Sequence, residues 1–305
     1  MAFQQTIKQS ITLNGIGLHS GAPVQVIIRP ATPHHGVTFI RTDLPGRPHV
    51  VAHYKSIVNT QMATTLGRGQ TKVSTVEHLL AALFMMGVDN AIVEVSGPEI
   101  PILDGSAAPY CEAILAVGVE VQQQPRTLIA LRRRVEVYSG EKWAVAEPSS
   151  RLEILGSIEW KHPAIGYQEF RYQDGKTDYS EMASARTFGF MKDVEALKKM
   201  GLARGGSLEN AIVLDEARVL NPDGLRYKNE FARHKVLDAL GDFMLAGIGI
   251  QGFVRLHKAG HDLHNQLLDS IFGNPDNFEI ITSTVRELRR PGIRAVLSAG
   301  YSPGV

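Results

Sequence analysis

Three polar side chains recur at intervals of four residues in the segment from Phe231 to Asp242. They are His234, Asp238 and Asp242, and on an α-helix this spacing places them in one line along a single face. Imidazole nitrogens and carboxylate oxygens are ligands that transition metals accept. The line therefore indicates a metal site, although a solvated helical stripe with a His–Asp pair has the same pattern.

A second candidate group is Glu77–His78, at the start of a predicted helix over residues 74–86. The helix dipole disfavours imidazolium near an N-terminus, so His78 is expected in the neutral form that a metal binds. Two imidazoles and one carboxylate with an open fourth position are a standard catalytic zinc arrangement, in which an adjacent free glutamate is a natural general base. Ser74 and Glu77 also have capping-box spacing, which gives Glu77 a purely structural alternative.

His261 is a third candidate, because it follows a predicted strand through a glycine. Loops of this kind carry exposed, positioned side chains, and a histidine with ordinary polar contacts is the alternative.

Gly15-x-Gly17 lacks the spacing and the following helix of a dinucleotide site. Other histidines lie in polar or turn-rich segments and are interpreted as surface residues, among them His34, His35, His49 and His53.

The elements that must position these groups alternate along the chain. In the first half the patterns predict strands at 25–29 and 91–95, a helix at 74–86, and a second helix that begins from a turn at 104–106 and runs to about residue 117. The second half predicts strands at 128–138, 143–147, 152–160 and 253–257, an irregular polar stretch at 161–180, and helices at 191–200 and 229–246. The polar, proline-containing segment 121–126 is interpreted as a linker. These patterns predict an α+β fold with domains at 1–125 and 126–305.

Composition narrows the classes of function. The formal net charge is +1 over 305 residues, which gives no bulk attraction to nucleic acid or an anionic membrane. Arg132-Arg133-Arg134 is interpreted as solvated positions on a strand. The single cysteine, Cys111, excludes an internal disulfide and fits a reducing compartment. The start of the chain is polar and the longest apolar run, 79–88, is half of the roughly 20 residues of a membrane span, so we expect a cytoplasmic protein.

Seven motifs together resemble the UDP-3-O-acyl-N-acetylglucosamine deacetylase (LpxC) family, in order and over nearly the whole chain. They are 15–21 (GIGLHSG), 75–79 (TVEHL), 101–106 (PILDGS), 185–191 (ARTFGFM), 224–227 (GLRY), 234–238 (HKVLD) and 260–266 (GHDLHNQ). The resemblance implies two similar domains, each a β-sheet layer packed on helices, with the active site at the domain interface. It also implies removal of the N-acetyl group from UDP-3-O-(3-hydroxyacyl)-N-acetylglucosamine, the committed step of lipid A biosynthesis.

The resemblance further implies a role for individual residues. The metal ligands would be His78, His234 and Asp238, with Glu77 as general base, His261 as acid, Asp242 as its orienting partner and Thr187 as an oxyanion donor. Contacts with the sugar, diphosphate or uracil would come from Lys235, Lys258, Lys142 and Trp160, and the acyl chain would pass Met191, Val194, Gly206 and Ser207, with Phe188 and Leu18 near the mouth. For Met191 and Val194, core packing is the alternative.

The cofactor, partners and rival functions follow from the same residues. Zn(II) is the expected metal, and Fe(II) suits the same two-histidine, one-aspartate set. The expected partner is a UDP-linked acylated amino sugar, bound by a monomer. One rival is a non-catalytic nucleotide-sugar or RNA-binding module, which would need no base and acid beside a metal. The other is a metal amidohydrolase with a different acylated substrate.

Overall fold

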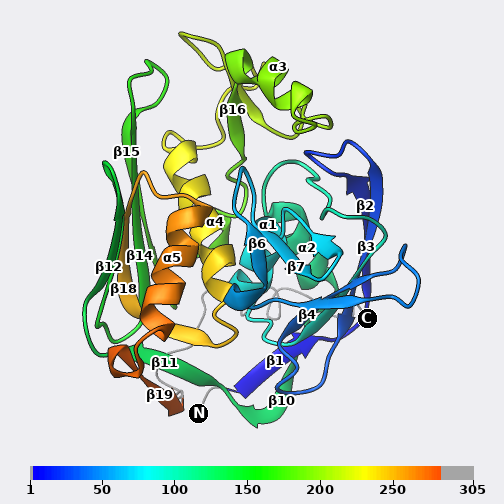
Figure 1. Cartoon of the computed structure of the whole chain (residues 1–305), viewed down its shortest axis with the longest axis vertical. Helices are drawn as coiled ribbons and strands as arrows, with labels where there is room; N and C mark the ends of the chain where they lie inside the picture. The colour runs from blue at the N-terminus through cyan, green and yellow to red at the C-terminus, as the bar shows by residue number, and fades with distance from the viewer. Residues whose placement is uncertain (1–2, 283–305) are drawn as a thin grey trace, which may run out of the picture.

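Two β-sheets stand on either side of a central group of helices in this protein (Figure 1). The computed structural model describes residues 3–282. The helices are α1 (Glu77–Met85), α2 (Ala108–Val117), α3 (Met191–Lys199), α4 (Glu230–Met244) and α5 (His261–Phe272). In Figure 1 the C-terminal sheet stands on the left, then α5 and α4, then α1 and α2, and the N-terminal sheet on the right. The predicted α+β class, with sheet packed on helix in each half, is confirmed.

The N-terminal sheet has the strand order β2-β3-β9-β4-β5. Its strands are β2 (Ile11–Ile16), β3 (Pro23–Pro30), β4 (Val37–Arg41), β5 (His49–Val51) and β9 (Ala91–Val95). β3 is antiparallel to β2 and β9, whereas β4 and β9 are parallel. Val24, Val26 and Ile28 of β3 are all buried in the hydrophobic core. Their period of two gives this sheet its apolar face, as the sequence predicts.

The C-terminal sheet is built around β18 (Gly249–His257), which is parallel to β11 and β14 and antiparallel to β13. Its other strands are β11 (Thr127–Leu131), β12 (Val135–Ser139), β13 (Lys142–Glu147), β14 (Leu152–Trp160), β15 (Gly166–Gln173) and β19 (Phe278–Thr282). The predicted single strand 128–138 is wrong, because residues 132–134 break it into β11 and β12. The three arginine side chains there are more than half exposed and connect strands rather than belonging to one.

Two elements of the C-terminal half differ from the sequence prediction. The stretch expected to be irregular contains β15, which forms a long antiparallel pair with β14. His261 does not lie in an exposed loop; it is the first residue of α5 and is buried. Leu263, Leu267 and Leu268 are buried on one side of α5, and this apolar spacing is typical of a helix.

The predicted capping box at the start of α1 is also wrong. The helix begins at Glu77 after Val76, and no side chain caps it. The Ser74 hydroxyl lies 3.0 Å from the Thr65 hydroxyl instead. The Glu77 carboxylate is therefore not engaged in closing the N-terminus of its own helix. The alternative that Glu77 serves only as a helix-capping residue is therefore excluded.

Smaller pairings complete the fold. They are β1 (Phe3–Ile7) with β10 (Val119–Pro125), the sheet of β6 (Ile57–Asn59), β7 (Thr65–Arg68) and β8 (Thr71–Val73), β16 (Phe188–Phe190) with β17 (Ile212–Leu214), and the 3-10 turns η1 (Tyr54–Ser56), η2 (Tyr179–Glu181) and η3 (Pro275–Asn277). The segment 121–126, interpreted from the sequence as a linker, lies mostly within the strand β10. The boundary at 125/126 stays a prediction, and 283–305 of the second domain lies outside the described residues. No helix in the described part of the chain is long and apolar enough to cross a bilayer.

The two halves meet where α1 packs against α4. Gly241 of α4 lies directly against the backbone of Glu77, and a Cβ atom built at Gly241 would fall 2.1 Å from the Glu77 carbonyl oxygen. Only a residue without a side chain permits this approach. The contact places the first turn of α1 beside the face of α4 that carries the predicted metal ligands.

We expect the Gly241→Ala variant to lose about 2 kcal/mol of unfolding free energy, because the added methyl group must push α1 and α4 apart. The measurement is urea-induced unfolding together with bound metal per chain. Gly97→Ala is the matched control, since its Cβ would meet Val24 at an ordinary 3.5 Å. Equal stability of the Gly241→Ala and Gly97→Ala proteins would contradict the proposed role of the close contact.

Candidate metal centre and active site

The three predicted metal ligands come together at the interface of α1 and α4. His78 is the second residue of α1, and His234 and Asp238 lie one turn apart on α4. Asp238 Oδ1 is 3.3 Å from His234 Nε2 and 3.6 Å from His78 Nε2. All three side chains are buried. The structure brings these three residues together, and the group is a candidate metal site.

The donor set fits a tetrahedral divalent ion. Ligand atoms about 2.0–2.1 Å from such an ion lie about 3.3 Å apart, which is close to the separations between the nitrogens and Oδ1 of Asp238. Burial lowers the pKa of His234 to about 3, so its imidazole is neutral. Its Nδ1 lies 3.0 Å from the Ala185 carbonyl oxygen and donates to it, which leaves Nε2 with a free lone pair for a metal.

Asp238 is held in its charged form. Burial alone would raise its pKa, but the interactions of Asp238 with His234 and with the charged Lys235 hold the pKa of Asp238 well below its usual range. Lys235 Nζ donates to Asp238 Oδ2 over 2.9 Å, while Oδ1 faces the two histidines. One carboxylate oxygen is thus occupied by the lysine and the other is directed at the metal site.

Glu77 lies beside the ligands without joining them. Its Oε2 accepts a hydrogen bond from the Thr64 backbone N–H over 3.1 Å, and its Oε1 is 3.8 Å from His261 Nε2. Burial raises the pKa of Glu77, and the neighbouring His261 lowers it only in part. A carboxylate with a raised pKa at the edge of a metal site has the properties of a general base.

Asp242 connects two histidines of α5 to the end of α4. Its Oδ2 accepts from His261 Nδ1 over 2.7 Å and from His264 Nδ1 over 2.8 Å, and its Oδ1 accepts from the Thr64 hydroxyl over 2.6 Å. The structure thus places His261 and Asp242, predicted as acid and orienting partner, in direct contact. His264 and Thr64 are not among the site residues predicted from the sequence. The i, i+3 spacing of His261 and His264 would have indicated a shared helix face if α5 had been predicted.

His261 and Asp242 stabilise each other's charged forms. Burial by itself would lower the pKa of His261, yet Asp242 and Glu77 raise it to about 10. Burial would raise the pKa of Asp242, but His261 and its hydrogen bonds lower it to about 2. His261 is therefore a protonated imidazole beside a carboxylate at neutral pH, with its Nε2 directed towards Glu77.

Thr187 and Phe188 lie in the segment that enters β16. The Thr187 backbone N–H donates to the Gly105 carbonyl over 2.8 Å, and its own carbonyl accepts from Ile212 N–H. The Phe188 ring lies 6.3 Å from the His234 ring, and Lys235 Nζ lies 5.5 Å from the Phe188 centroid. The structure therefore places Phe188 and Lys235 next to His234, a candidate metal ligand, and Thr187 two residues after the carbonyl that accepts from His234.

One predicted nucleotide contact, Trp160, packs beside the candidate site, whereas Lys258 and Lys142 do not. The Trp160 ring packs edge-on against Phe188, with 5.7 Å between centroids, and so reaches the site indirectly. Lys258 forms ion pairs with Glu141 at 3.3 Å and Glu159 at 3.4 Å, and the exposed Lys142 begins β13. Neither lysine forms an ion pair with a candidate metal ligand.

The predicted acyl-chain residues lie around α3, which projects from the top of the molecule in Figure 1. Met191 is 47% exposed and no residue of α3 is buried, so core packing of Met191 and Val194 is ruled out. A Cβ at Gly206 would lie 3.6 Å from the Leu18 side chain, which makes those two neighbours, and Ser207 follows in the same exposed loop. A cavity of about 340 Å³ borders Phe84 and other residues near the far ends of α1 and α4, and the candidate metal ligands do not line it.

Comparisons with known proteins agree with this geometry. The profile of the LpxC family, UDP-3-O-acyl N-acetylglycosamine deacetylase, matches residues 4–273. A UDP-3-O-acyl-N-acetylglucosamine deacetylase of Myxococcus xanthus is 48% identical over 95% of this chain and 93% of its own length. Enzymes of the same name from Geobacter sp. and Haemophilus influenzae are 42% and 45% identical over 95% and 94% of this chain, and 96% and 95% of their own lengths. The chain therefore belongs to the UDP-3-O-acyl-N-acetylglucosamine deacetylase family.

Proposed function

We propose that this protein is a metal-dependent hydrolase that removes the N-acetyl group from UDP-3-O-(3-hydroxyacyl)-N-acetylglucosamine. The products are acetate and the free amine, and the reaction is the committed step of lipid A biosynthesis. The observation that carries the proposal is the convergence of His78, His234 and Asp238 beside a separate base, Glu77, and a separate acid, His261. The relatives' names supply the substrate.

The metal is proposed to be Zn(II), with Fe(II) as the alternative that the same ligands accept. When bound, the ion would acidify a water molecule and polarise the amide carbonyl. The buried, neutral His234 and the ionised Asp238 have the protonation states that such an ion requires. His78 completes the set from the other half of the chain.

The remaining residues perform the proton transfers. Glu77 removes a proton from the attacking water as the water oxygen bonds to the acetyl carbon. The Thr187 hydroxyl donates to the oxygen that becomes negative. Protonated His261 then gives its Nε2 proton to the departing nitrogen as the carbon–nitrogen bond breaks, and Asp242 stabilises and orients the imidazolium before that step.

The substrate carries charge, a base and an apolar chain, which call for different side chains. Lys235 and Lys258 are proposed to bind the sugar or diphosphate, with Lys142 and Trp160 near the uridine. The acyl chain is proposed to run past Phe188 and Leu18 towards α3, along Met191, Val194, Gly206 and Ser207. A nucleotide-sugar substrate and the free buried Cys111 support a cytoplasmic location.

We expect Glu77→Ala to retain its metal and to lose kcat by about 10²–10⁴-fold, because the base is removed while the ligands stay. His234→Ala should lose the metal itself. The measurements are metal per chain and acetate release from the UDP substrate. Release of the metal by Glu77→Ala would reassign Glu77 as a ligand, and full activity in His234→Ala would refute the metal mechanism.

The pH profile tests the acid. Activity is lost as the pH rises through the pKa of His261, which the charge of Asp242 raises. Asp242→Asn removes this charge, so the alkaline limb of kcat/KM should move to lower pH. Thr64→Val removes a hydrogen-bond donor to Asp242. The Asp242 carboxylate is then less neutralised by that donor and attracts the His261 imidazolium more strongly. The same limb should therefore move to higher pH. Shifts in the same direction would argue against His261 as the acid.

Recognition of the diphosphate can be separated from chemistry. We expect Lys258→Met to raise KM, and the inhibition constant for UDP, about tenfold, since a charge-assisted hydrogen bond contributes about 1.5–3 kcal/mol. The kcat should change less than threefold. Lys72→Met, an exposed lysine of β8, is the control. Unchanged UDP inhibition in Lys258→Met would remove Lys258 from the binding site.

A further inference from the structure

A buried ion pair joins the chain before β16 to the first turn of α4. Arg186 Nε lies 2.9 Å from Glu230 Oε1, and Arg186 Nη2 lies 3.2 Å from Glu230 Oε2. The two residues are only 5% and 0% exposed. Glu230 Oε1 also accepts from the Arg186 backbone N–H over 3.1 Å. One carboxylate thus holds both the side chain and the main chain of Arg186.

Glu230 extends the polar line of α4 by one further turn. It precedes His234 by four residues, as His234 precedes Asp238, and residues at this spacing share a helix face. The side chain at each position of this line is buried. The ion pair is therefore attached to the same helix face as the metal ligands.

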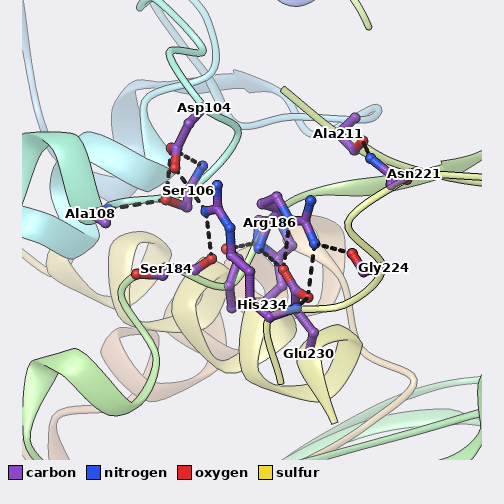
Figure 2. A network of polar contacts seen from close by, with 12 residues as sticks. Asp104, Ser106, Ala108, Ser184, Arg186, Ala211, Asn221, Gly224, Glu230 and His234 are labelled. Atoms are coloured by element: carbon purple, nitrogen blue, oxygen red, sulfur yellow. Dashed lines mark hydrogen bonds and ion pairs between the residues drawn. The ribbon is translucent and has the colours of Figure 1, made fainter. Parts of the chain in front are cut away.

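The backbone on either side of Arg186 contacts the active site. Before it, the Ala185 carbonyl accepts from His234 Nδ1 and so fixes the tautomer and ring orientation of that ligand. After it comes Thr187, the proposed oxyanion donor, whose N–H donates to Gly105. Figure 2 shows Arg186 between Glu230 and Gly224, with His234 alongside. Movement of Arg186 would displace both the Ala185 carbonyl and Thr187.

The pair also organises the turn that precedes α4. Arg186 Nη2 donates to the Gly224 carbonyl over 2.8 Å, and Glu230 Oε2 accepts from the Arg226 backbone N–H. The Arg226 side chain donates to Asp104 Oδ2 over 2.8 Å and to the Ser184 carbonyl over 3.0 Å. The motifs 101–106, 185–191 and 224–227 are therefore parts of one network across the two halves of the chain.

The energetics point to orientation rather than stability. Desolvation of two buried charges offsets their attraction, and well-packed apolar residues are often as stable or more so. Outer-shell groups that orient a metal ligand, by contrast, typically change metal affinity or activity 10–100-fold when altered.

We propose that the Arg186–Glu230 ion pair is a positioning device, which sets the Ala185 carbonyl against His234 and Thr187 against the reacting carbonyl. Its kinetic consequence rests on the proposed deacetylase function. Its consequence for metal affinity does not, because His234 needs its Ala185 partner whatever the substrate is. The two residues touch neither substrate nor metal and act only through Ala185 and Thr187.

The test compares the single variant Arg186→Met with the paired apolar variant Arg186→Met/Glu230→Leu. The single change leaves a buried carboxylate without its partner, whereas the double change removes both charges. Readouts are Tm, Zn²⁺ affinity by competition with a chromophoric chelator, the visible spectrum of the Co²⁺-loaded protein, and kcat and KM for acetate release. Arg29→Met, which breaks the exposed Arg29–Glu94 pair, is the control.

We expect the double variant to recover most of the Tm lost by Arg186→Met while Zn²⁺ affinity stays 10–100-fold below wild type, the Co²⁺ spectrum stays altered, and kcat falls at least tenfold with KM within threefold. Arg29→Met should match the wild type in Zn²⁺ affinity and kcat. Recovery of Zn²⁺ affinity and kcat along with Tm would overturn the proposal, because the pair would then be only structural. A wild type that binds Zn²⁺ but releases no acetate would refute the deacetylase function, and the affinity comparison would still test the pair.

Discussion

The close approach of α1 and α4 at Gly241 and the Glu77 carbonyl is the constraint on which the site depends. Metal binding needs donor atoms within a few ångströms, and His78 is more than 150 residues from His234 in the chain. A normal helix pair has axes 8–10 Å apart with side chains between them. Because position 241 is a glycine, no side chain separates the two backbones there, and the candidate ligands from both helices can meet.

Two buried carboxylates of the candidate site, Glu77 and Asp242, show how one site gives the same chemical group opposite properties. Asp242 accepts hydrogen bonds from His261, His264 and Thr64, which stabilise its charge and lower its pKa. Glu77 is equally buried but accepts a single backbone hydrogen bond, so desolvation dominates and its pKa rises. The first is a permanent anion that supports an imidazolium, and the second can exchange a proton. Their different hydrogen-bond partners separate the roles.

The polar line along α4 gives each turn of the helix a separate task. Glu230 holds Arg186, His234 and Asp238 belong to the candidate metal site, and Asp242 binds His261, the proposed acid. Each buried charge faces a group of opposite charge or a set of donors, which is the condition for burying it at all. A helix with buried charges on one face and Val236, Leu240 and other core residues on the other can pack between the two halves without losing its apolar contacts.

Local pattern was enough to predict the α+β class, some of the strands, such as β3, β9, β13 and β14, and the line on α4, because periodicity and turn residues depend only on neighbours in the chain. It left open whether His234 and Asp238 were a solvated stripe, and it placed His261 in a loop; the seven motifs supported the catalytic roles only as a resemblance. Tertiary structure decided the burial of these groups, the loss of the predicted cap at Glu77, and the contacts of His264, Thr64 and Glu230. Those properties arise between residues far apart in sequence, and the pKa and hydrogen bonding of a side chain depend on what folding brings beside it.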